Sequence, residues 1–118
     1  MEMRLHHVQI SGPAGCEPQM RAFWVDVIGL DEAPKPERLR PRGGAWFRSG
    51  GLELHVGIEE GFAPARKAHP GIAVGDVEEL AARVESSGAP VVWDASIPGL
   101  RRFHTADPFG NRVEFQQA

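Results

Sequence analysis

Tyrosine is absent from the 118-residue sequence, and cysteine occurs only once, as Cys16. A single cysteine cannot form an internal disulfide, so this composition is typical of a protein of the reducing cytoplasm. No apolar run approaches the roughly 20 residues that a membrane-spanning helix needs. Residues 1–11 contain neither a long apolar stretch nor a small-residue cleavage site, so no signal peptide is expected. The sequence therefore predicts a cytoplasmic protein without a membrane partner.

A strong excess of charge is also lacking. The formal net charge is -3 and the sequence pI is about 5.9, so nothing in the overall charge attracts the protein to nucleic acid. Hydrophobic residues make up 42% and charged residues 25%, which is the usual balance of a globular protein. A chain of this length suffices for one domain and is short for two. We expect a single domain that spans residues 1–118.

Helical and strand periodicities alternate along the first half of the chain. Alternation of polar and apolar residues predicts strands, and apolar residues spaced three and four apart predict a helix that ends at Gly29. The expected elements are a strand at residues 4–11, a helix at 17–28, at most an edge strand within the proline-containing residues 33–44, and two strands at 45–48 and 52–58 joined by a tight glycine turn.

The same order of elements returns in the second half. Asp76 has a glutamate three residues later, which is the pattern of a capping box at the start of a helix. The expected elements are a strand at residues 69–74, a helix at 76–87, strands at 90–94, 101–105 and 112–116, and a turn at 107–111 before the last strand.

The order of elements is therefore βαβββ, a linker, and βαβββ again. Corresponding features recur at a nearly constant distance along the chain: His7 and His69 are 62 residues apart, Glu53 and Glu114 are 61 apart, and Gly29 and Gly88 are 59 apart. An internal repeat of this kind indicates one supersecondary unit used twice. We predict an α+β fold of two βαβββ units with mixed, curved sheets, the first at residues 1–60 and the second at 67–118.

Four residues of metal-ligand type occupy matching places in the two predicted units. Each lies on the polar face of a strand whose other face is apolar and must pack against a helix, so the polar face is left lining a wet cleft. Imidazole and carboxylate together suit a divalent ion such as Zn, Ni, Co, Mn or Fe. Such an ion keeps open positions for substrate oxygens and acts as a Lewis acid. The four residues are His7, Glu53, His69 and Glu114.

Five segments resemble those of the vicinal oxygen chelate superfamily, which includes glyoxalase, bleomycin resistance and extradiol dioxygenase-like domains. The segments are LHHVQI, FWVDVIGL, GLELHV, HPGIAVGDVEEL and DPFGNRVEF, and they are spread over nearly the whole chain. The resemblance implies a glyoxalase-like fold that is commonly dimeric. It also implies metal ligands at His7, Glu53, His69 and Glu114. His55 shares the face of Glu53 and is an alternative ligand in its place.

The function that this resemblance implies is that of a metal-dependent enzyme, a lyase or a group transferase, acting on a small oxygen-rich metabolite or xenobiotic. One carboxylate, Glu53 or Glu114, would act as the general base. The absence of tyrosine excludes a dioxygenase that relies on tyrosine around its metal. Further residues expected to contact substrate are Gln9, Trp46, Arg48, Trp93 and His104.

Two alternatives remain open at this point. The first is a metal-free protein of the bleomycin resistance type that sequesters a toxic compound, with Trp46, Trp93 and Phe109 as apolar walls. A module that only binds a partner protein ranks behind it.

The second alternative concerns a cationic run before residue 45, which is interpreted as a solvated loop or else as a lid over an anionic substrate. This run consists of Lys35, Arg38, Arg40 and Arg42.

The predicted sheets lead to a prediction about assembly. Four strands in each unit, with short edges marked by proline, leave much of each curved sheet open to a partner. We therefore expect a homodimer in solution, and light scattering should give twice the mass of one chain. A monomer at tens of micromolar would contradict this expectation.

Overall fold

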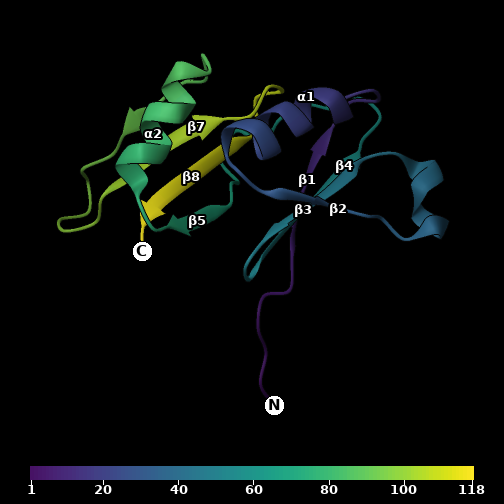
Figure 1. Ribbon diagram of the computed structural model, residues 1–118, viewed down its shortest axis with the longest axis horizontal. Helices are drawn as coiled ribbons and strands as arrows, with labels where there is room; N and C mark the ends of the chain where they lie inside the picture. The colour runs from purple at the N-terminus through teal and green to yellow at the C-terminus, as the bar shows by residue number, and fades with distance from the viewer. The chain divides into compact units, whose positions relative to one another are not determined.

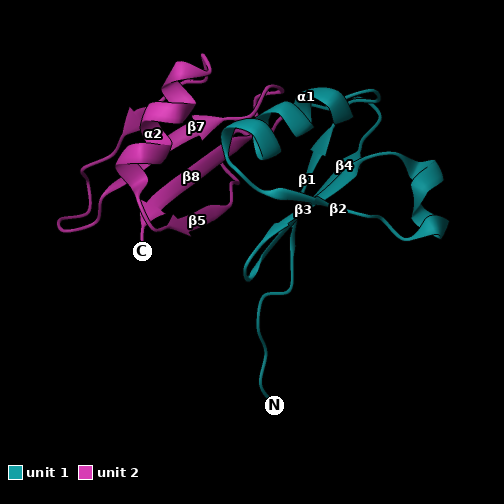
Figure 2. Ribbon diagram, viewed as in Figure 1, with its two compact units in different colours: residues 1–63 teal, residues 64–118 magenta.

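The computed structural model describes residues 1–118 and divides into two compact units, Met1–Ala63 and Pro64–Ala118 (Figure 2). Each unit combines one four-stranded sheet with helical segments (Figure 1). The first unit contains β1 (Val8–Gly12), α1 (Glu17–Arg21), η1 (Ala22–Val27), β2 (Asp31–Ala33), η2 (Glu37–Arg42), β3 (Ala45–Ser49) and β4 (Leu52–Ile58). The second contains β5 (Gly71–Val74), α2 (Val77–Ser86), β6 (Val92–Trp93), β7 (Arg102–Ala106) and β8 (Arg112–Gln117).

The two sheets have the same topology. Their strand orders are β1-β4-β3-β2 and β5-β8-β7-β6, so the first strand of each unit lies beside its last strand. These two strands pair in parallel, and the other neighbours pair antiparallel. The predicted α+β fold of two βαβββ units with mixed sheets is confirmed.

One face of each sheet packs into an apolar core. In the second unit Phe103, Val113 and Phe115 are fully buried, and α2 contacts β7 and β8 over this face. Because side chains alternate along a strand, the residues between these apolar ones lie on the opposite face. The polar face of each sheet is therefore left for other contacts. None of the helices has the length and apolar character needed to cross a membrane.

Both predicted helices are present with nearly the predicted bounds. The α2 helix begins after Asp76, whose carboxylate accepts a hydrogen bond from the Glu79 N–H at 3.0 Å, as the capping box predicted. The first helix runs through α1 and then continues as the π-helix η1. There Ile28 N–H donates to the Phe23 carbonyl at 2.9 Å, five residues back. Apolar spacing alone did not predict this wider final turn.

The turn between β7 and β8 is organised by one carboxylate. Asp107 accepts backbone hydrogen bonds from Phe109 at 2.9 Å and from Asn111 at 3.0 Å. Burial raises the pKa of Asp107, while these N–H groups and the Asn111 amide favour its charged form. The predicted turn at residues 107–111 is thus held by an Asp-centred network.

The first strand of each unit is shorter than predicted. We predicted strands from residues 4 and 69, whereas β1 begins at Val8 and β5 at Gly71. Val8 is opposite Leu54, two residues after β4 begins, so earlier residues have little partner strand left to pair with. In the second unit Pro70 has no N–H to give to a ladder, although its carbonyl accepts from Glu114 N–H at 3.0 Å.

The proline-containing segment also differs from the prediction. The edge strand β2 ends at Ala33, and Glu37–Arg42 forms the 3-10 helix η2 with Pro41 inside it. Proline lacks the N–H that a strand ladder needs, while its fixed φ suits a short tight helix. In the second unit, the strand predicted at residues 90–94 is reduced to the two residues of β6.

Gly44 provides a test of the local packing before β3. Its φ is +85°, and a Cβ there would collide with the carbonyl oxygen of Val56. We expect Gly44→Ala to lower the free energy of unfolding by about 3 kcal/mol or more, because strain and collision add. Gly50→Ala is the matched control, with φ +54° but open space around the new methyl group, and should cost about 1 kcal/mol. Urea denaturation measures the free energy of unfolding of both variants. Equal losses would contradict the collision between a Cβ at residue 44 and the Val56 carbonyl oxygen.

Candidate metal centre

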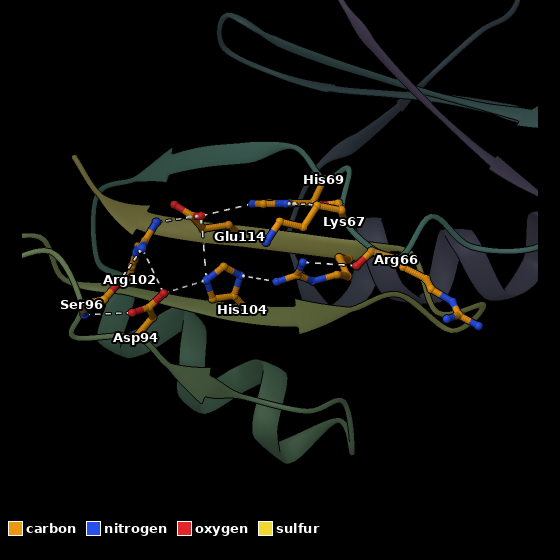
Figure 3. Close-up of polar contacts among 9 residues, drawn as sticks. Arg66, Lys67, His69, Asp94, Ser96, Arg102, His104 and Glu114 are labelled. Carbon is orange, nitrogen blue, oxygen red and sulfur yellow. Dashed lines mark hydrogen bonds and ion pairs between the residues drawn. The ribbon is translucent and has the colours of Figure 1, made fainter.

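Three side chains of metal-ligand type lie together on the polar face of the second sheet (Figure 3). Glu114 lies on β8, with Gly71 of β5 and His104 of β7 directly beside it. His69 precedes Gly71 by two residues, and its ring reaches the Glu114 carboxylate (Figure 3). We predicted His69 and Glu114 as ligands and His104 as a substrate contact, and the fold brings all three together.

The distances within this cluster are short. Glu114 Oε1 lies 3.3 Å from His69 Nε2 and 3.9 Å from His104 Nε2. The three candidate ligand atoms all lie within 4.8 Å of one another. Two ligands bound at about 2.1 Å to one tetrahedral ion are roughly 3.4 Å apart, so the His69–Glu114 spacing already suits a shared cation.

The orientation of His69 shows why a cation fits there. His69 Nδ1 lies 2.9 Å from the Lys67 carbonyl oxygen, which can only accept, so Nδ1 carries the proton. In the neutral ring, Nε2 then presents a lone pair to Glu114 Oε1, which is also an acceptor. Two facing acceptors repel unless a proton or a metal ion lies between them. A backbone carbonyl that fixes the Nδ1–H tautomer is the usual support of a metal-binding histidine.

Arg102 connects this carboxylate to a second one. Its guanidinium donates to Glu114 Oε1 at 3.2 Å and to Asp94 Oδ2 at 2.9 Å. Hydrogen bonds from Ser96 lower the pKa of Asp94 to about 2, with His104 and Arg102 adding to the effect. Asp94 is therefore a carboxylate at neutral pH.

His104 is held from both sides of its ring. Arg112 Nη2, which can only donate, lies 3.5 Å from His104 Nδ1, so Nδ1 is the acceptor and the proton is on Nε2. Nε2 lies 3.3 Å from Asp94 Oδ2. To bind a metal through Nε2, His104 must give up this proton and its contact with Asp94, whereas His69 Nε2 carries no proton in the neutral ring.

A hollow of about 460 Å³ lies beside the cluster, within the second unit. This volume falls inside the usual range for small-molecule sites. Residues of opposite charge and apolar residues share its lining, among them Val92, Trp93, Asp94, His104 and Arg112. A small molecule in this hollow would contact the same His104 that borders Glu114.

The first unit carries a stack of rings on its polar face. The Trp46 and His55 rings are parallel, with centroids 4.0 Å apart. The His7 ring also stacks on His55, with centroids 4.3 Å apart. His55 is 6% exposed although it belongs to the polar face, and its Nε2 has no hydrogen-bond partner. Glu53 Oε2 lies 3.5 Å from that nitrogen. The predicted ligands His7 and Glu53 therefore lie close to His55, the predicted alternative to Glu53, within their own unit.

Strand register changes the correspondence between the units. His7 and His69 each precede the first strand, and the residues two places later are Gln9 and Gly71. Gln9 is opposite His55, as Gly71 is opposite Glu114. Counted in this way, the counterpart of Glu114 is His55, whereas the sequence offset suggested Glu53.

The other predicted substrate contacts are divided between several places. Arg48 is exposed and lies opposite Glu53, and Gln9 is exposed on β1. Trp93 packs against Phe103, with ring centroids 5.3 Å apart, and also borders the hollow of the second unit. These residues remain predicted substrate contacts. Phe109, predicted as an apolar wall of the metal-free binding protein, lies in the turn before β8.

Sequence reasoning did not include Asp94 and Arg102 in the site. Arg102 lies two residues before His104 on β7, so strand alternation could have placed it on the same face. Asp94 follows the edge strand β6, and no sequence pattern fixes which side of the sheet it approaches.

A family model and a solved structure both relate this chain to glyoxalase-like proteins. A family model described as a glyoxalase-like domain matches residues 17–115. A solved structure from Bacillus anthracis, described as a glyoxalase family protein, is 43% identical with a TM-score of 0.95, over 99% of this chain and 96% of that chain. Among curated proteins, no sequence match is found.

Two more distant structures share the fold. One is a mutant of the fosfomycin resistance protein of Listeria monocytogenes, complexed with Mn(II) and 1S,2S-dihydroxypropylphosphonic acid. It is 14% identical with a TM-score of 0.81, over 100% of this chain and 94% of that chain. The other is an antibiotic binding protein from Streptomyces, 22% identical with a TM-score of 0.72, over 98% of each chain. At these identities, the similarity concerns the fold alone.

The buried His55 leads to a pH-dependent stability. Burial lowers the pKa of His55 below 6.5, and the neighbouring His7 adds to this effect. Between the lowered pKa and 6.5 the unfolded chain binds more protons, so stability is fully present above pH 6.5 and falls as the pH drops below it. We expect His55→Phe, which keeps a ring in the stack, to lose less unfolding free energy than wild type between pH 7.5 and 5.5.

The control for this measurement is His6→Phe, because His6 is exposed and lies next to the stack. Urea denaturation of the three proteins at both pH values should leave the pH dependence of His6→Phe close to that of wild type, because His6 is the smallest of the causes that act on the pKa of His55. If His55→Phe shows the same dependence too, the proposed origin of the effect is wrong.

Proposed function

This chain belongs to the glyoxalase-like domain family, and from that premise we propose that it is a metal-dependent enzyme of the vicinal oxygen chelate superfamily. Its substrate would be a small metabolite or xenobiotic with two neighbouring oxygens, and its reaction an isomerising lyase reaction or a group transfer. The observation that carries this proposal is the pair of facing acceptors, His69 Nε2 and Glu114 Oε1, 3.3 Å apart.

The donor set fits a divalent transition metal. Two imidazoles and one carboxylate, from His69, His104 and Glu114, are the ligand types that Zn, Ni, Co, Mn and Fe accept. His69 is the most prepared of the three, because the Lys67 carbonyl fixes its ring. In the first unit, His7 remains a predicted ligand, together with either Glu53 or His55.

When bound, the ion would act as a Lewis acid toward two substrate oxygens. The residues of the chain would do the rest. Arg102 donates to Glu114 Oε1 and holds that oxygen in place. Glu114 Oε2 forms no hydrogen bond or ion pair. Its neighbour on β5 is Gly71, where an added Cβ would lie 4.0 Å from this oxygen, so no side chain covers it from that strand. That oxygen is therefore free to accept a substrate proton, while Glu53 is the alternative base.

A second candidate is a metal-free binding protein that sequesters a toxic compound. Arg102 Nη1 lies 3.2 Å from Glu114 Oε1 and already compensates the carboxylate without a metal ion. The hollow lined by Val92 and Trp93 would then be the binding site itself. Assembly as a homodimer and a cytoplasmic location complete both forms of the proposal.

Metal content distinguishes the two candidates. Protein purified without an affinity tag and reconstituted with Ni, Co, Zn, Mn or Fe should hold one ion per chain by elemental analysis. His69→Ala and Glu114→Ala should each abolish tight binding, because each removes one of the facing acceptors, and His7→Ala tests the ligand predicted in the first unit. Affinity should fall as the pH falls, since histidine must be neutral to bind a metal.

The control variant is His6→Ala, which removes an exposed histidine outside the cluster and should keep the full metal content. If wild type holds no divalent ion after reconstitution, the enzyme proposal fails and the sequestering protein becomes the better one. If the ion persists in both His69→Ala and Glu114→Ala, the site has been assigned to the wrong residues.

A further inference from the structure

A second hollow, of about 200 Å³, lies between the strands of the first sheet and the segment before β3. One side is formed by the strands, with Gln9 of β1, Trp46 of β3 and Ile58 of β4. The other side is formed by the segment before β3, with Lys35, Leu39 and Arg42. Its volume is below the roughly 300 Å³ at which sites for drug-sized ligands begin, so it suits a small group.

The charge in this hollow has one sign. It contains Lys35 and Arg42 and no carboxylate, and neither residue forms an ion pair. A neighbouring hollow, which Lys35 also borders, contains Glu17 and Glu32. In that hollow Arg21 pairs with Glu32 at 2.7 Å. The smaller hollow is therefore the one whose lining has cationic side chains and no carboxylate.

The cations are positioned by the glycine turn at the end of η2. The Lys35 ammonium donates to the Gly43 carbonyl, and Gly43 N–H donates to the Arg40 carbonyl at 3.1 Å. Gly43 and Gly44 have φ values of +74° and +85°, which other residues rarely adopt. An ammonium has three N–H groups, so two remain available on Lys35. Arg42, directly before this turn, adds a planar guanidinium.

The strand side of the hollow is also preformed. The Gln9 amide lies over Gly57, where an added Cβ would be only 2.6 Å from Gln9 Nε2. Trp46 is half-buried and fixed by its stack on His55. An amide that can donate and an indole wall thus lie beside the two cations, with the apolar side chains of Leu39 and Ile58 completing the lining.

We propose that this hollow binds an anionic oxygen group, carboxylate or phosphate, carried on a small planar apolar body. Lys35 and Arg42 would pair with the anion by charge-assisted hydrogen bonds, and the planar body would lie against Trp46. This inference rests on the first unit alone and does not depend on the metal site of the second.

The test is a titration of the whole chain at fixed ionic strength, followed by the indole N–H resonance of Trp46 in NMR spectra. Trp46→Phe identifies that resonance among the three tryptophans of the chain. The probes are benzoate, phenyl phosphate, inorganic phosphate and the uncharged benzyl alcohol. We expect saturable shifts with benzoate or phenyl phosphate, and the comparison between them identifies the anion. Benzyl alcohol and inorganic phosphate should bind at least about tenfold more weakly, because each lacks one half of the recognised group.

Variants separate a built site from general positive charge. Arg42→Gln and Lys35→Gln should each weaken the preferred probe about tenfold, which is the loss of one charge-assisted contact. Arg38→Gln removes the same charge from the same 3-10 helix but does not line the hollow, so it should bind like wild type. Arg42 is exposed, so its variant tests the proposal even if Lys35→Gln disturbs the turn.

Three outcomes would overturn the proposal, and the first two concern selectivity. One is binding of benzyl alcohol as tight as that of benzoate and phenyl phosphate, and the other is an equal loss in Arg38→Gln and Arg42→Gln. Absence of any saturable shift in wild type would have the same consequence. The titration is repeated on His69→Ala, where an unchanged affinity keeps this site distinct from the proposed metal centre.

Discussion

The parallel pairing of the first and last strands of each unit determines what the polar faces can hold. In the second unit this pairing places β8 between β5 and β7, so Glu114 has a neighbour from another strand on each side. Side-chain alternation then directs the apolar residues Val113 and Phe115 into the core and the glutamate outward. A buried carboxylate surrounded by imidazole and guanidinium groups follows from this arrangement.

The hydrogen-bond donors around Glu114 leave one pair of acceptors facing each other. The Lys67 carbonyl accepts the proton of His69 Nδ1, so in the neutral ring Nε2 can only accept. Arg102 supplies donors to two carboxylates, Glu114 and Asp94, and thereby keeps both in place. The one interaction without a donor of its own is that between His69 Nε2 and Glu114 Oε1. A group that supplies positive charge at that point, whether a proton or a metal ion, relieves the repulsion.

Much of the fold could be predicted from side-chain periodicity. The strand Leu52–Ile58 and the capped helix α2 have strong local patterns, and both were predicted with nearly the observed bounds. The short first strands could not be predicted, because their length depends on where the partner strand begins. The π-helical end of the first helix depends on hydrogen bonds five residues apart, which the apolar spacing does not encode.

The candidate site was predictable to the extent that strand alternation determines it. Alternation and family resemblance together selected His69 and Glu114, which lie 3.3 Å apart. Cross-strand register could not be obtained from the sequence, and it decides that His104 lies directly beside Glu114. Arg102 then reaches both Glu114 and Asp94. The register also decides that His55, and not Glu53, occupies in the first unit the place that Glu114 has in the second.

The repeated topology has a consequence for how such a chain can diversify. Each unit builds its polar face from the four strands of its own sheet. The face of the second unit is rich in ionisable groups, whereas that of the first is a ladder of aromatic rings bordered by cations. Two copies of one scaffold thus carry polar faces of different chemistry, ionisable in one unit and aromatic in the other.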